Sequence, residues 1–155
     1  GDEGKYLVQG NDGGVGISYD RGEKWRFVEN LPLAQFYEID VDTTSVPYHI
    51  YGGMQDNGSW YGPSEVWREK GMLNLYWQRV GGGDGFATIP GWSESQVGEL
   101  YRFDKVTGSQ DGIQPTKPDS AELRFNWNAP LAVSPHDPNT LYFGSQYVHR
   151  STDDG

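Results

Sequence analysis

Three short loops place aspartate beside glycine, and they carry the residue types best suited to chemistry. They are residues 11–14, 55–58 and 83–85, which read NDGG, QDNG and GDG. Hydrolysis of a glycosidic bond needs two carboxyl groups that flank the bond, one of them with a raised pKa. Asp84 and Asp12 form one candidate pair, with Asp84 as the acid and Asp12 as the base. These sequences are also favoured β-hairpin turns, so a turn role stays open for Asp12 and Asp56.

Amide and aromatic side chains accompany these aspartates in segments that we expect to meet on one loop-rich face. Aromatic rings stack on sugar faces, while amides and carboxylates bond to hydroxyl groups, so this composition suits a carbohydrate. The glycines before Asp84 would let the backbone approach a ligand closely. The predicted ligand-binding residues are Gln35, Tyr37, Gln55, Asp56, Asn126, Trp127 and Asn128.

The elements that must position these residues are short strands in a repeated unit. A strand–turn–strand pattern recurs with its turn at Asp20, Gly62, Asp104 and Asp153, which are 42, 42 and 49 residues apart. A period of this length with short strands is typical of four-stranded propeller blades. The chain also has 22 Gly and 22 aromatic residues in 155, which indicates β-structure with many tight turns.

The repeat predicts an all-β chain, 1–155, that forms an incomplete β-propeller of antiparallel four-stranded blades. The approximate blade units are 1–35, 36–85, 86–130 and 131–155, so the chain holds roughly three to four blades, and propellers close with at least four. We therefore expect closure either with the remainder of a longer chain or with a second copy.

Two of the turns share the pattern Ser-x-Asp-x-Gly. The Asp carboxylate can accept backbone N–H groups inside a tight turn, the glycine supplies a conformation that other residues resist, and Trp25 adds a large apolar ring. We expect a structural clip for the hairpin rather than a catalytic aspartate. The residues of the two patterns are Ser18, Asp20, Gly22 and Trp25, and Ser151, Asp153 and Gly155.

On these turns the chain resembles the Asp-box (BNR-repeat) β-propellers, a group that includes sialidases, sortilin-type receptor domains and family-74 xyloglucan hydrolases. Residues 77–86 (WQRVGGGDGF), 125–130 (FNWNAP) and 134–138 (SPHDP) are most similar to the sortilin-like branch. That resemblance implies a binding module for a glycan or a peptide. Residues 83–86 also resemble the acid-bearing segment of family-74 hydrolases, two residues shorter, which implies the alternative of a β-glucan hydrolase.

Charge and composition exclude several other classes. The formal net charge is −10 and cysteine is absent, which disfavours binding to nucleic acid and excludes thiol chemistry. The three histidines have no metal-ligand spacing, so we expect neither a metal nor a cofactor. No apolar run approaches the length of a membrane span, so membrane insertion is not expected. The missing cysteine does not decide the compartment, and we expect a secreted or periplasmic protein.

Overall fold

The computed structural model describes residues 4–11, 13–31, 34–117 and 122–155 of the chain. These residues form four antiparallel sheets of three or four strands, together with two short 3₁₀ turns. The prediction of an all-β chain is therefore confirmed. The chain divides into two compact units, Gly1–Ala34 and Gln35–Gly155.

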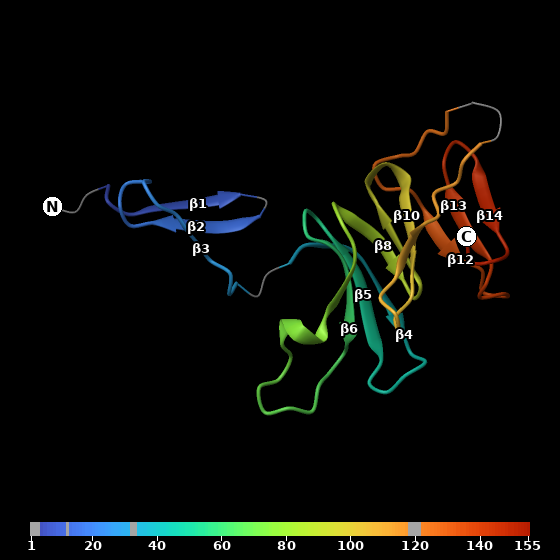
Figure 1. Cartoon of the computed structure of the whole chain (residues 1–155), viewed down its shortest axis with the longest axis horizontal. Helices are drawn as coiled ribbons and strands as arrows, with labels where there is room; N and C mark the ends of the chain where they lie inside the picture. Colours follow the sequence, from blue (N-terminus) through green and yellow to red (C-terminus); the bar gives the residue numbers. More distant parts are fainter. Residues whose placement is uncertain (1–3, 12, 32–33, 118–121) are drawn as a thin grey trace. The chain divides into compact units, whose positions relative to one another are not determined.

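The first unit is a three-stranded sheet, drawn in blue in Figure 1. Residues Leu7 and Ser18 face each other at one end of the first hairpin. The ring of Trp25 lies against Gly16, where an added Cβ atom would stand 3.2 Å from it, and it stays 46% exposed. The strands are β1 (Leu7–Asn11), β2 (Gly14–Ser18) and β3 (Arg26–Phe27), in that order.

The second unit contains three sheets, each a meander in which strands that follow one another in the chain are paired (Figure 1). The first has β4 (Phe36–Asp42), β5 (His49–Met54), β6 (Gly58–Pro63) and β7 (Gln78–Gly81). The second has β8 (Gly85–Ile89), β9 (Trp92–Ser95), β10 (Glu99–Phe103) and β11 (Gln110–Gly112). The third has β12 (Leu131–Val133), β13 (Leu141–Gly144) and β14 (Val148–Ser151). The 3₁₀ turns are η1 (Asn74–Tyr76) and η2 (Gln96–Gly98).

The sheet of β8–β11 has apolar contacts with both of the other sheets of its unit. On one side, Phe103 packs on the stacked rings of Tyr51 and Tyr61, whose centroids are 5.3 Å apart. On the other side, a second cluster joins it to β12–β14. That cluster contains Trp92, Leu100, Ala129, Leu141 and Phe143, all buried.

Glycine allows the sheets of β4–β7 and β8–β11 to meet backbone to backbone. A Cβ atom on Gly53 would overlap the backbone of Gly85 and Phe86, and one on Gly85 would overlap Gly58. The N–H of Gly58 donates to the carbonyl oxygen of Gly83 at 2.9 Å. This contact places the β5–β6 turn directly beside the β7–β8 turn, and both turns carry predicted site residues.

Candidate functional site

Asp84 joins three segments of the second unit. Its Oδ1 accepts the backbone N–H of Asp56 at 2.8 Å, and its Oδ2 accepts the indole Nε1–H of Trp127 at 3.3 Å. Asp56 lies in the β5–β6 turn, Asp84 in the β7–β8 turn, and Trp127 in the segment that precedes β12. The Asp84 carboxylate therefore links segments that adjoin all three sheets of this unit by hydrogen bonds.

Two exposed aromatic rings accompany this carboxylate. Tyr37, at the start of β4, is 40% exposed and packs on Phe86 with ring centroids 4.6 Å apart. Partial burial, followed by the negative charges of Asp84 and Asp56, raises the pKa of Tyr37. The hydroxyl of Tyr37 therefore lies within the field of both carboxylates. Trp127 is 57% exposed, so a ring face stays open to solvent.

Polar side chains of the second sheet fix the turn that carries Asp84. The Oε1 atom of Gln96 accepts the backbone N–H of Asp84 at 2.7 Å. The hydroxyl of Ser95 lies 3.0 Å from the carbonyl oxygen of Asp84 and 2.7 Å from the same Gln96 oxygen. Ser93 donates to the carbonyl oxygen of Val80 at 2.7 Å. The turn is therefore held before any ligand arrives.

Two glutamates extend the site toward residues 128 and 129. The side-chain amide of Asn128 donates to Glu38 Oε1 at 3.4 Å, and the N–H of Ala129 donates to Glu94 Oε1 at 3.0 Å. Glu94 is fully buried, and its Oε2 has no hydrogen-bond partner among the described residues. Burial, with a further contribution from the charge of Glu38, raises the pKa of Glu94 to about 8, so this carboxyl is protonated at neutral pH.

Most of the predicted site residues lie close together in the chain's second unit. Asp56 and Trp127 both bond to Asp84, and Tyr37 packs on Phe86 within the field of Asp84 and Asp56. Gln35 and Gln55 are adjacent through a backbone hydrogen bond of 3.1 Å, and Asn126 is exposed in the same segment as Trp127. Asp12 lies outside the described residues, so its pairing with Asp84 stays a prediction.

Sequence reasoning missed Glu38, Glu94 and Gln96. Glu38 could have been found from its position, because it directly follows the predicted site residue Tyr37 in the same strand. Glu94 and Gln96 gave no such signal, because a polar Ser-Glu-Ser-Gln run reads as a solvated strand, whereas Ser93, Glu94 and Ser95 are buried.

The two Ser-x-Asp-x-Gly turns share one hydrogen-bond pattern. The Ser18 hydroxyl donates to Asp20 Oδ1 at 2.8 Å and accepts the N–H of Gly22 at 2.7 Å. In the second turn, Ser151 donates to Asp153 at 2.6 Å and accepts the N–H of Gly155 at 2.8 Å. The N–H of Lys24, then Ser18, lowers the pKa of Asp20. All these contacts are internal to the turn.

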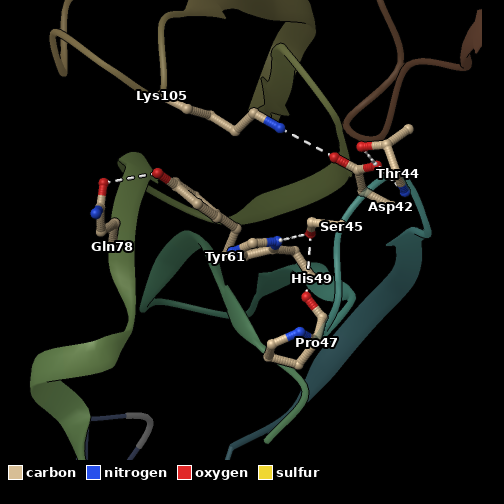
Figure 2. Close-up of polar contacts among 8 residues, drawn as sticks. All are labelled: Asp42, Thr44, Ser45, Pro47, His49, Tyr61, Gln78 and Lys105. Atoms are coloured by element: carbon tan, nitrogen blue, oxygen red, sulfur yellow. Dashed lines mark hydrogen bonds and ion pairs between the residues drawn. The ribbon is translucent and has the colours of Figure 1, made fainter. Parts of the chain in front are cut away.

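A second polar cluster lies at the opposite end of the first sheet of this unit, and Figure 2 shows it. Ser45 Oγ donates to the carbonyl oxygen of Pro47 at 3.1 Å and lies 2.9 Å from His49 Nδ1. Whether His49 Nδ1 donates to Ser45 or accepts from it depends on the tautomer of the imidazole ring.

Of the other contacts in this cluster, one joins the first sheet to the second and one lies within the first sheet (Figure 2). Lys105 Nζ pairs with Asp42 Oδ2 at 2.9 Å, and the hydroxyl of Tyr61 donates to Gln78 at 2.7 Å. Hydrogen bonds from Thr44, then Lys105, hold the pKa of Asp42 well below its usual range. A shallow groove of about 370 Å³ lies beside this cluster, lined by Thr43, Ser45, Val46, Pro47, Tyr48, Ser64 and Glu65.

No protein-family model matches the chain, and no curated protein matches it. Within the described ranges, no helix is both long and apolar enough to cross a membrane. Across the same ranges, no three His, Cys, Asp or Glu residues are grouped so that they could hold a metal ion.

Proposed function

We propose that the chain is a β-propeller binding module of the sortilin-like Asp-box type, and that it recognises a glycan or a peptide on the face that carries Asp84. The observation that carries this proposal is the joint position of Tyr37, Asp56, Asp84 and Trp127. These residues come from separate loops and combine two exposed rings with polar groups, which is a usual composition of binding sites. The sheet contact at Gly53 and Gly85 supports it, because it holds the loops in place without a ligand.

The propeller part of the proposal is supported by the strand order within each sheet. Each sheet is a meander of three or four strands. The Ser-x-Asp-x-Gly pattern follows β2 in the first unit and β14 in the second. In this proposal the chain closes with the remainder of a longer chain or with a second copy. Light scattering after gel filtration tests the second route: a mass of twice 17.4 kDa supports closure by two copies, and a monomer rejects it.

The alternative of a β-glucan hydrolase is supported less well. It assigns the acid role to Asp84, but both oxygens of Asp84 already accept N–H groups of the protein. The second carboxylate, Asp12, lies outside the described residues. We therefore prefer binding to hydrolysis.

Binding is tested by screening the chain against arrays of immobilised glycans and peptides. Trp127→Ala should lose the ligands that the unmodified chain retains, because the ring face and its link to Asp84 both disappear. Trp67→Ala is the matched control, since Trp67 is 88% exposed and bonds only within its own loop, to Glu65. Equal loss in both variants, or no loss in Trp127→Ala, contradicts the proposed site.

A further inference from the structure

We propose that the site at Asp84 takes the cationic side chain of a peptide, a lysine ammonium or arginine guanidinium, between the Tyr37 and Trp127 rings and the carboxylates of Asp84 and Glu38. This inference rests on the proposed function and specifies the ligand. Neutral glycans and amino sugars become outcomes of the test.

The first argument is uncompensated charge. The ion pairs among the described residues join Arg102 to Asp111 and Lys105 to Asp42, so neither of them neutralises Asp84 or Glu38. Arg79, in β7, directs its Nε to the carbonyl oxygen of Gly81 at 3.0 Å, and its guanidinium lies against Gly58 of the β5–β6 turn without an ion pair to Asp84 or Glu38 among the described residues. A neutral ligand would remove water from these carboxylates without compensating their charge, whereas a cation compensates it.

The second argument is the aromatic pair. A cation is attracted to the face of a Trp or Tyr ring within about 6 Å of its centroid. Trp127 and Tyr37 are 57% and 40% exposed, and Trp127 is fixed at its N–H edge by Asp84, which leaves its faces available. Partial burial of Tyr37, followed by the negative charges of Asp84 and Asp56, raises its pKa, so both carboxylates act on this ring. Rings and carboxylates thus favour the same ligand group.

The third argument is the depth of Asp84. Its side chain is half-buried, while the rings of Tyr37 and Trp127 are exposed. A ligand that carries its charge at the end of a slender stem is best suited to approach a half-buried carboxylate. Lysine and arginine carry their charge at the end of an apolar stem that packs well along a ring. An amino sugar carries its ammonium directly on a bulky ring and lacks such a stem.

The test is an NMR titration of the ¹⁵N-labelled chain with blocked Gly-Gly-Lys-Gly-Gly, in which the lysine is the only charge. The control peptide has norleucine in place of lysine, which keeps the stem and removes the charge. We expect the lysine peptide to shift the Trp127 indole and Asp56 amide resonances, with an affinity that falls as NaCl is raised. The norleucine peptide should cause no shift.

Variants separate the parts of the proposal. Glu38→Gln leaves the contacts of Asp84 intact and should weaken binding of the lysine peptide about tenfold, as should Tyr37→Leu. Tyr37→Phe keeps the ring and should bind as the unmodified chain does. Glu69→Gln makes the same charge change at an exposed residue of the β6–β7 loop and should have no effect.

The outcomes also separate this inference from the proposed function. If cello-oligosaccharides shift the same resonances and the lysine peptide does not, the binding site stands and the cationic ligand is rejected. Equal binding of the norleucine peptide, or shifts caused only by glucosamine oligomers or by CaCl₂, likewise overturns it. No shift with the lysine peptide overturns it as well.

Discussion

Trp127 and Asp84 lie 43 residues apart in the chain and share a hydrogen bond from indole Nε1 to carboxylate Oδ2 at 3.3 Å. The other oxygen of Asp84 accepts the N–H of Asp56. Asp84 therefore controls the orientation of an exposed ring and the position of a neighbouring turn together. A single carboxylate in this place is more important for the shape of the site than any one aromatic residue.

Asp84→Asn should release the Trp127 ring. An asparagine can still present its oxygen to the N–H of Asp56, but its NH₂ group then faces the indole N–H, so two donors oppose each other. We expect faster solvent exchange of the indole proton and a red shift of tryptophan emission. Asp111→Asn, at an exposed ion pair of β11, is the control and should change neither signal. An unchanged indole exchange rate would show that Asp84 does not hold the ring.

Gly53→Ala should destabilise the second unit. The added Cβ overlaps the backbone of Gly85 and Phe86, which cannot rotate away as a side chain can. Overpacking of this kind costs about 1–3 kcal/mol, or more. Urea unfolding measures the loss, and Gly112→Ala, where the new atom would lie 4.0 Å from the Tyr101 ring, is the control. Equal stability of the two variants would contradict the backbone contact.

Ser18→Ala should open the first Ser-x-Asp-x-Gly turn. Ser18 is fully buried, and its loss leaves the N–H of Gly22 without its acceptor. An unsatisfied backbone group of this kind costs about 1–3 kcal/mol. Amide hydrogen exchange at Gly22 should therefore accelerate by at least about fivefold. Tyr19→Phe, which keeps the ring against Tyr6, should leave the exchange rate unchanged.

Glu94 should make the second unit less stable as pH rises. Its pKa is about 8 in the folded protein and near 4.5 in the unfolded chain, so between these values the unfolded chain releases a proton that the folded protein retains. The free energy of unfolding then falls by at most about 1.4 kcal/mol per pH unit from this group.

Glu94→Gln should remove that slope, because glutamine keeps an oxygen for the N–H of Ala129 and has no proton to release. Urea unfolding at pH 5 and pH 8 measures it. The variant should lose less stability over this interval than the unmodified chain, and equal losses would show that Glu94 is not the group responsible.

The sequence predicts the strands well, because they depend on local patterns. Short β-rich segments separated by Gly, Asp and Asn are enough to indicate the blade starts at 36 and 131, where β4 and β12 begin. The expected shared face of Tyr37, Asp56 and Trp127 rests on the alternation of strand direction within each meander and stays a prediction.

The parts that escaped prediction depend on contacts between sheets. Glu94 is buried because β9 lies inside its sheet and the segment before β12 covers it, and no period in Trp92–Ser95 indicates this. The glycines before Asp84 were expected to let the backbone approach a ligand closely, and Gly83 lies against the amide of Gln96. The role of Gly85, which accommodates the backbone of Gly58, gave no signal in the sequence.

The close backbone contact between β5 and β8, at Gly53 and Gly85, has a mechanical consequence. Where backbone meets backbone there is no side chain that could change rotamer and absorb a displacement. An added Cβ atom on Gly53 or on Gly85 would overlap the backbone on the other side, so neither position tolerates a side chain. The turns beside this contact are therefore held rigidly. A ligand at Asp84 meets a surface that folding has already ordered, so binding loses little further conformational entropy there.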